Sequence, residues 1–426
     1  MPQGEGSFIM FIAIGIVVIL AVIALLLKRY ESRMVLVGAG LLMAIIAMKP
    51  MMALDGFAKS MTNAGLIMSV CSSMGFAMVM KYTTCDKHLV SAIAAVLKKL
   101  GYLLIPGTVI ATFVVNIAIP SAAGCAAAVG VIFIPILMSA GVHPAMAAAA
   151  VKSGTFGSML NPGLVHNGVV AKLAGTQITD VIGHQMNIVV IGMLVAAVVL
   201  TILAVLMKEN SGHAAEGGME AEDFKVNALY ACMPLLPVVI LLLGATKVVP
   251  AFKMGVAQAM VIGALVSLAV TRTNPVGLTK SFFDGMGKGY GDIIGIIISV
   301  GVFVAGLNAL GVIKAVIAAM LNSTGLVKLA ASFGPFLLAI ISGSGDAATV
   351  AFNESITPHA AEFGMNIMSM GSIATFGGTL GRTISPIAGA TIIVAGIAGV
   401  DPMEVCKRNA LGITLALIAG MVIMLF

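Results

Sequence analysis

Four ionisable side chains stand inside apolar segments of this sequence, where a charge is costly. Arg382 lies within the run "TFGGTLGRTISPIAGATIIV" (375–394), and Asp346, His166 and Lys152 lie in comparable surroundings. Ionisable residues inside a membrane usually mark a substrate or ion path. A guanidinium can bind a carboxylate through two parallel hydrogen bonds. The sequence therefore predicts that Arg382 binds a carboxylate, with structural pairing to Asp346 or to backbone carbonyls as the alternative.

The other three side chains allow more than one role. Asp346 could pair with Arg382, bind a coupling cation such as Na⁺, or take up a proton. His166 could carry a proton, although a lone histidine more often packs as a hydrogen-bonded residue. We interpret Lys152 as a side chain that snorkels from near the cytoplasmic face, with a counter-charge in the first half as the alternative.

Glycine, proline and small hydroxyl residues surround these charges and should interrupt helices. Two hairpin tips are predicted at "PSAAG" (120–124) and "SGSGD" (342–346), and two interrupted spans at "GTFGSMLNPGLVHNG" (154–168) and "GGTLGRTISP" (377–386). Unwound backbone at membrane depth is tolerated only where it is buried in protein or lines a wet cavity. The helix N-termini at such a break favour anions, and the carbonyl groups at the helix C-termini favour cations. We expect the four elements to meet at a substrate site near the midplane.

The predicted substrate contacts come from both tips and both interruptions: Ser121, Ala122, Ala123, Gly124, Asn161, Pro162, Ser342, Gly343, Ser344, Gly345, Thr379, Gly381, Arg382, Thr383 and Ser385. The predicted contacts to a coupling ion or a proton are Asp346, His166, Thr155, Gly157, Thr375 and Gly377, with a possible Na⁺ near Asp346.

The composition places these motifs in a membrane protein. Of 426 residues, 60% are hydrophobic and 9% are charged, against roughly 25% charged in an average soluble domain. Residues 8–27 are long enough to span the bilayer and lack the basic leader of a signal peptide. The net charge is +6, and the basic residues lie in short loops, where such residues set the orientation of a membrane protein. No nucleic-acid partner is therefore expected.

No enzyme or cofactor motif stands out in the sequence. It has no Walker loop, no HExxH, no GxSxG elbow and no Cys/His metal spacing, and its five cysteines form no CxxC pair. Without an ATPase signature, transport should draw on ion or substrate gradients. We therefore expect a transporter with no cofactor and not an enzyme.

The two halves of the chain resemble each other. "SAAGCAA" (121–127) matches "SGSGDAA" (342–348), and "TFGSML" (155–160) matches "TFGGTL" (375–380). "AGTQITD" at 174–180 likewise matches "AGIAGVD" at 395–401, and the three offsets are 221, 220 and 221 residues. Ordered matches at a nearly constant offset predict an internal repeat.

The topology follows from the spans and the basic residues. If 103–138 and 327–352 are re-entrant hairpins, each half has five full spans, and an odd number inverts the second half. Fourteen Lys and Arg then fall in the cytoplasmic loops and seven in the opposite ones, if both termini are periplasmic. The fold class predicted is an all-α polytopic membrane protein with two inverted-topology repeats. Its predicted parts are the repeats 1–207 and 228–426 and the cytoplasmic linker 208–227.

Residues 341–408 resemble the anaerobic C4-dicarboxylate carriers of the DcuC type. The resemblance rests on "SGSGDAA" followed by "LGRTISPIAGATIIVAGIAGVDPMEVCKR", and it is weaker upstream. It implies a bacterial inner-membrane transporter of the ion-transporter superfamily, a homodimer with elevator-type scaffold and transport domains. The scaffold it implies comprises spans 8–100 and 228–322, and the implied transport elements are 103–175 and 327–399. The implied substrates are fumarate, malate, succinate or aspartate, moved by exchange or by cation-coupled transport. Asn often stands in the family where this chain has Asp346, which leaves substrate range and the coupling ion, H⁺ or Na⁺, open.

Two other functions fit the residues. The first is a carrier for a different organic anion, such as a gluconate-like or citrate-like acid. The second is an anion channel, since broken helices and inverted repeats also occur in channels. Re-entrant tips in both halves favour alternating access over a channel.

Overall fold

A computed structural model describes residues 5–28, 30–62, 64–97, 101–213, 225–245, 254–315 and 324–426. Within these ranges the chain forms helices and no strands. Among the described residues, four helical stretches are long and apolar enough to cross a membrane: Ala122–Ser139, Ile178–Leu206, Pro275–Ala309 and Pro402–Leu425. Several shorter apolar helices accompany them. The prediction of an all-helical chain rich in apolar helices is confirmed for the described residues.

The first half contains α1 (Glu5–Leu27), α2 (Ser32–Ile46), α3 (Pro50–Met61), α4 (Ala64–Tyr82), α5 (Cys85–Leu97), α6 (Leu104–Ala118), α7 (Ala122–Ser139), α8 (Pro144–Ser153), the 3-10 turn η2 (Gly157–Leu160), α9 (Val165–Ala174) and α10 (Ile178–Leu206). The second half contains α11 (Ala228–Cys232), η3 (Met233–Leu235), α12 (Leu236–Ala245), α13 (Val256–Thr271), α14 (Pro275–Lys288), the π-helical η5 (Gly289–Ile294), α15 (Gly295–Ala309), α17 (Thr324–Ser342), α18 (Gly345–Ser355), η6 (Thr357–Phe363), α19 (Ile367–Thr383), α20 (Gly389–Ala398) and α21 (Pro402–Leu425).

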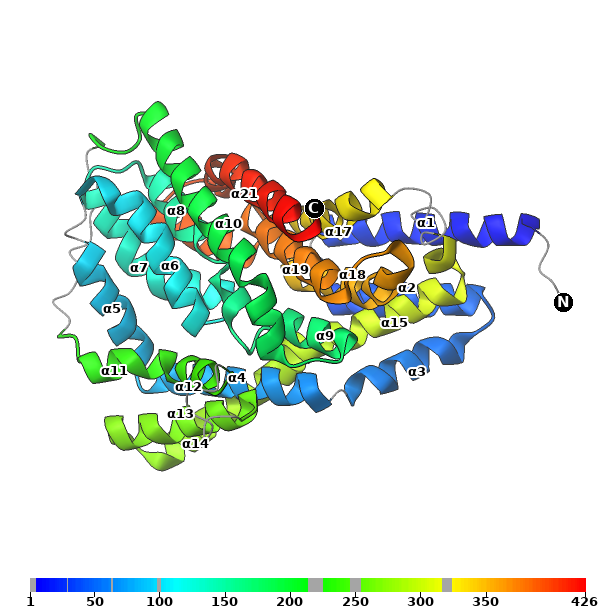
Figure 1. The fold of residues 1–426 in the computed structure, drawn as a ribbon, viewed down its shortest axis with the longest axis horizontal. Helices are drawn as coiled ribbons and strands as arrows, with labels where there is room; N and C mark the ends of the chain where they lie inside the picture. The colour runs from blue at the N-terminus through cyan, green and yellow to red at the C-terminus, as the bar shows by residue number, and fades with distance from the viewer. Residues whose placement is uncertain are drawn as a thin grey trace.

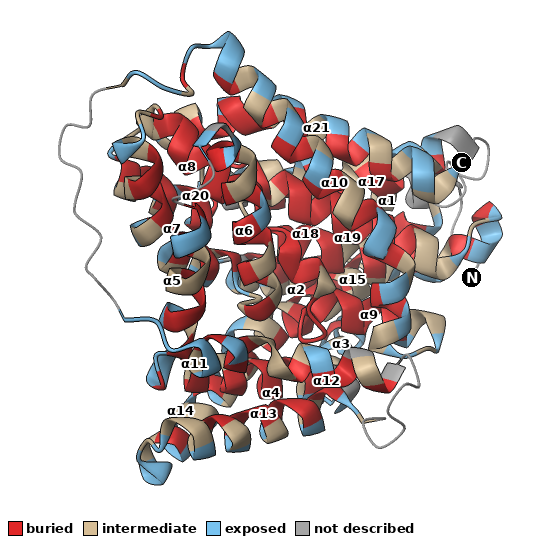
Figure 2. Ribbon diagram, turned by 60° about the vertical axis from the view of Figure 1, so that its left-hand side comes forward, coloured by how far each residue is buried: buried red, intermediate tan, exposed pale blue. Residues whose placement is uncertain are grey.

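The helices gather in groups that mix the two halves of the chain. Helices α2 and α3 pack against α15, and α4 packs against α13 and α14 (Figure 1). Helices α10 and α21 lie side by side, and α19 packs against α17, α18 and α21. Figure 2 shows α18 and α19 in the middle of the molecule, where neither helix has an exposed residue and most of α19 is buried. The segments that carry the predicted site are therefore interior elements.

Two helix pairs turn back on themselves at the predicted hairpin tips. Helix α6 ends at Ala118, and Ser121 caps α7 by accepting a hydrogen bond from the Gly124 N–H at 3.1 Å. The second pair turns at Gly343, whose φ of +72° is a left-handed conformation that favours glycine. Ser344 then caps α18. Both turns lie at the hairpin tips that the sequence predicts.

The predicted interruption at 377–386 is only partly correct. The backbone stays α-helical through Thr383 and is irregular only over 384–388, before α20 begins at Gly389. Three glycines in "GGTLG" do not unwind the helix, because α19 is buried and its backbone bonds are satisfied internally. Arg382 consequently lies in the last turn of a helix and not in an unwound segment.

Candidate functional site

Arg382 reaches from the second half of the chain to the first. Its Nη2 donates a hydrogen bond to the carbonyl oxygen of Thr155 at 3.2 Å, just beyond the end of α8. Its Nε is buried and has no hydrogen-bond partner among the described residues, although the residue as a whole is half-buried. The negative end of the α19 dipole favours a cation at this place. The guanidinium is therefore held at one edge and has donors left for a ligand.

Asp346 pairs with His166 and not with Arg382. The Asp346 Oδ1 lies 3.0 Å from the His166 Nε2, and no ion pair within 4 Å joins Asp346 to Arg382 in the described residues. Arg382 is still within electrostatic range of this carboxylate. The Asp346 side chain is 33% exposed and the His166 side chain 1%. The second hairpin tip thus meets the first turn of α9 across the two halves.

The structure therefore brings Arg382, Asp346, His166 and Thr155 together. Gly345 adds to this group, because a Cβ there would lie 3.3 Å from the Arg382 Cβ and 2.8 Å from the Gly378 carbonyl oxygen. Only glycine allows the start of α18 to approach α19 so closely.

The first hairpin tip is tied to the first interruption by buried amides. Asn116 accepts a hydrogen bond from the Ser158 N–H at 2.7 Å and donates to the Ile119 carbonyl at 2.9 Å. Asn161 donates to the Ile117 carbonyl at 2.5 Å. Predicted contacts Ser121, Ala122, Ala123 and Gly124 form the start of α7, and Pro162 lies in the loop before α9. The sequence reasoning did not include Asn116, although a lone amide side chain in an apolar run indicates a buried polar contact.

A second buried amide that the sequence reasoning missed is Gln185 in α10. Its Nε2 donates to the Met159 carbonyl at 2.7 Å and to the Asn167 Oδ1 at 2.8 Å. Asn167 in turn donates to the Met159 and Asn161 carbonyls at 2.9 and 3.0 Å. Unwound carbonyls of the first interruption are thus satisfied by side chains, as buried backbone requires.

The second interruption is fastened to its own hairpin. Ser385 donates from Oγ to the Ile340 carbonyl at 2.7 Å, and Thr391 donates to the Ser385 carbonyl at 2.7 Å. Predicted contacts Ser342, Gly343, Ser344 and Gly345 form the turn between α17 and α18. Ser385 is thus occupied with holding the turn in place.

The threonine hydroxyls of α19 differ in whether they donate a hydrogen bond within the helix. Thr375 donates to the Gly371 carbonyl at 2.8 Å, and Thr383 donates to the Thr379 carbonyl at 3.1 Å. The Thr379 Oγ1 is buried and has no hydrogen-bond partner in the part of the chain that the structure describes. Of the three, Thr379 is the hydroxyl still available to a ligand.

Three predicted site glycines are explained by helix packing. A Cβ on Gly157 would lie 2.1 Å from the Phe113 carbonyl oxygen. On Gly377 and Gly381 it would lie 2.2 and 2.1 Å from carbonyl oxygens of α17. These contacts are far inside van der Waals distance, so the glycines let helices touch through their backbones.

Lys152 does not snorkel, and that interpretation was wrong. The side chain is 0% exposed in the last turn of α8, and its Nζ has no hydrogen-bond partner. The α8 helix is enclosed by α6, α7, α20 and α21, which leave the lysine no route to either surface. This packing could not be read from the position of Lys152 in the sequence.

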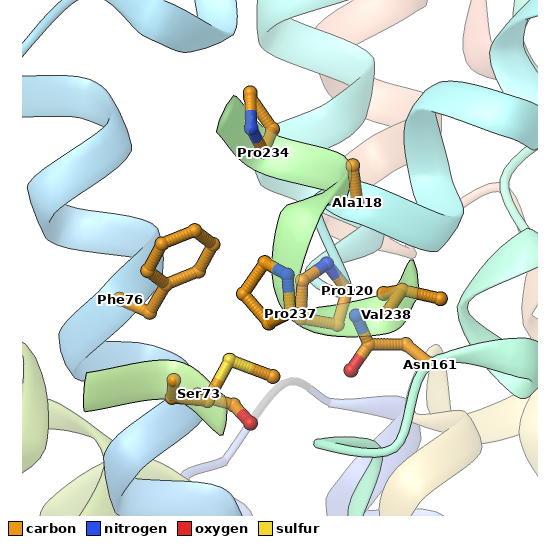
Figure 3. A pocket seen from close by; sticks show the side chains of 9 residues that line it. Ser73, Phe76, Ala118, Pro120, Asn161, Pro234, Pro237 and Val238 are labelled. Atoms are coloured by element: carbon orange, nitrogen blue, oxygen red, sulfur yellow. The ribbon is translucent and has the colours of Figure 1, made fainter. Parts of the chain in front are cut away.

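A small pocket adjoins the first hairpin tip. Ala118, Pro120 and Asn161 line one side, and residues of α4, α12 and α13 line the other (Figure 3). The residues from that second group are Ser73, Phe76, Pro237, Val238 and Met260, with Pro234 of η3. In the described residues no three His, Cys, Asp or Glu side chains gather as a metal site. Asn161 is the predicted contact that faces this pocket.

Comparison with known proteins identifies the family of the chain. The family model for the DcuC C4-dicarboxylate anaerobic carriers matches residues 43–426. A Haemophilus influenzae protein named only as an uncharacterised transporter is 44% identical over 273 residues, which cover 61% of this chain and 98% of that protein. The anaerobic C4-dicarboxylate transporter DcuC of Escherichia coli K12 is 23% identical over 449 aligned residues, covering 95% of this chain and 94% of that protein.

These matches confirm the resemblance carried by residues 341–408 and extend it over nearly the whole chain. They also confirm that the protein is a transporter and not an enzyme. The apolar helices agree with a multi-pass membrane protein. The chain therefore belongs to the DcuC family of C4-dicarboxylate carriers.

Proposed function

We propose that this protein is a secondary transporter of small dicarboxylates such as fumarate, malate, succinate or aspartate. The observation that carries this proposal is the state of Arg382. It is held by one backbone carbonyl, is not paired with Asp346 and keeps a buried Nε without a partner. A carboxylate is the ligand that satisfies a guanidinium both in charge and in geometry.

Alternating access by an elevator motion is the proposed mechanism. Support comes from the order of elements, since α6 to α10 in the first half have counterparts in α17 to α21. The matched residues Phe156 and Phe376 touch, with ring centroids 6.3 Å apart, as residues beside a pseudo-twofold axis do. We assign 103–175 and 327–399 to the moving domain and 8–100 and 228–322 to the scaffold. The pocket of Figure 3 lies along that boundary.

The coupling ion is proposed to be a proton if transport is not pure exchange. Asp346 already faces the His166 ring at 3.0 Å and lies within range of Arg382. The His166 ring and the Arg382 guanidinium near this carboxylate disfavour a sodium ion beside it, whereas an Asp–His pair can exchange a proton. The proposed setting is a homodimer in the bacterial inner membrane with both termini periplasmic.

Counterflow tests this function. Purified protein in proteoliposomes loaded with unlabelled succinate should accumulate labelled succinate transiently, because a carrier exchanges substrate across the membrane. A channel gives no acceleration from internal substrate. A parallel panel with citrate and gluconate identifies the acid, and transport of these acids without any transport of C4-dicarboxylates would refute the proposal.

A further inference from the structure

A second buried cation stands near Arg382 without a counter-charge. The Lys152 Nζ has no hydrogen-bond partner, and no carboxylate of the described residues lies within 4 Å of it. The charged group that acts on it is Arg382, which has the same sign, and its other ionisable neighbours are the thiols of Cys125 and Cys406. Burying an uncompensated ammonium is costly. A bound anion would supply the missing counter-charge.

One turn of backbone connects the two cations. The Lys152 carbonyl accepts hydrogen bonds from the Thr155 N–H at 3.1 Å and the Thr155 hydroxyl at 2.8 Å. The Thr155 carbonyl then accepts from Arg382 at 3.2 Å. Each cation occupies the last turn of its helix, Lys152 in α8 and Arg382 in α19, where the dipole partly compensates the charge. Each half thus contributes one cation at the end of an equivalent helix.

We propose that Lys152 is the second positive charge of the substrate site and makes it select dianions over monoanions. This inference rests on the proposed function and deepens it. The ammonium is fully buried, so it acts through space behind Arg382 and does not touch the ligand. In a low-dielectric interior a charge interaction is stronger at a given distance than it is in water, so such an action reaches the substrate.

The charges near the site fit this assignment. The cations are Arg382 and Lys152, and the facing ionisable groups are Asp346 and His166 at 3.0 Å from each other. Asp346 is paired with His166 and lies within 4 Å of neither cation in the described residues, so both cations are left for a ligand. Two carboxylates of one dicarboxylate match those two charges, whereas a monoanion leaves one buried cation uncompensated.

The test compares succinate with succinamate, which has the same length and one negative charge fewer. The full-length protein and its Lys152→Met variant are titrated with both compounds, and the ratio of the two Kd values is measured. We expect Lys152→Met to reduce the preference for succinate about tenfold, equivalent to about 1.4 kcal/mol. The control is Lys172→Met, a half-exposed lysine of α9, which should leave the ratio unchanged.

The Tm of the ligand-free protein separates this role from a structural one. Removing an uncompensated buried charge should raise the Tm of Lys152→Met, whereas loss of a structural contact lowers it. Lys152→Gln is the second variant if Met folds poorly. If the wild-type protein prefers succinate and both variants keep the ratio of the two Kd values within twofold of the wild-type ratio, this inference is refuted and the proposed function is not. A wild-type protein that binds neither compound refutes the proposed function with it.

Discussion

Replacing Arg382 by lysine separates the charge of the guanidinium from its geometry. Lysine keeps one positive charge but has a single nitrogen in place of a planar fork. In the structure one arm of that fork already donates to the Thr155 carbonyl at 3.2 Å, and Nε has no partner. A lysine nitrogen cannot serve the carbonyl and grip a carboxylate in two places at once.

The size of the effect follows from the bonds lost. A hydrogen bond to a charged group is worth roughly 1.5–3 kcal/mol, and every 1.4 kcal/mol is a factor of ten in affinity. Loss of one such bond therefore predicts a fall of about 10- to 150-fold in kcat/KM for fumarate or succinate. Uptake into proteoliposomes at fixed protein density measures this fall.

The matched control is Arg272→Lys, which changes an exposed arginine at the end of α13. It should transport at the wild-type rate. If Arg382→Lys also keeps its kcat/KM within twofold of wild type while eluting as a folded protein, the guanidinium does not bind the carboxylate and the reasoning is wrong.

Three further outcomes are expected from the packing. Gly381→Ala places a methyl group 2.1 Å from a carbonyl oxygen of α17 and should lower the free energy of unfolding by about 1–3 kcal/mol. Gly396→Ala is the control, because the space around Gly396 is open and the stability of this variant should not fall. Equal Tm values for the two variants would contradict this account of the packing. Glu209→Gln removes the carboxylate that the buried Arg408 holds through its Nε at 2.7 Å, so thermal unfolding should report a loss of about 3 kcal/mol. Burial lowers the pKa of His143, so the unfolded state binds its proton more readily and stability should fall as pH drops below about 6.5. A His143→Gln variant should lessen that fall, and an unchanged Tm–pH curve would count against it.

The hairpin tips and interruptions were predictable because they depend on local residue types. Gly343 must adopt a positive φ, and Ser121 and Ser344 cap the helices that follow them. The extent of the second interruption was not predictable. Burial of α19 keeps a glycine-rich segment helical through Thr383, and local propensity gives no hint of that burial.

The pairing of charges depended on contacts between distant segments. His166 and Asp346 are 180 residues apart in the chain, yet their Nε2 and Oδ1 atoms lie 3.0 Å apart. The sequence offered Arg382 as the partner of Asp346, and only the packing of α9 against α18 shows otherwise. Lys152 is a similar case, because the helices around α8 decide whether its long side chain reaches water.

The sequence by itself determined the class of protein, the residues that bear charge in apolar segments and the family. Those follow from composition, which measures how much apolar surface must leave water, and from short motifs with fixed backbone requirements. The tertiary structure decided which charges meet, which glycines serve packing and which lysine is buried. These depend on the three-dimensional packing of segments far apart in the chain, which local residue patterns do not encode.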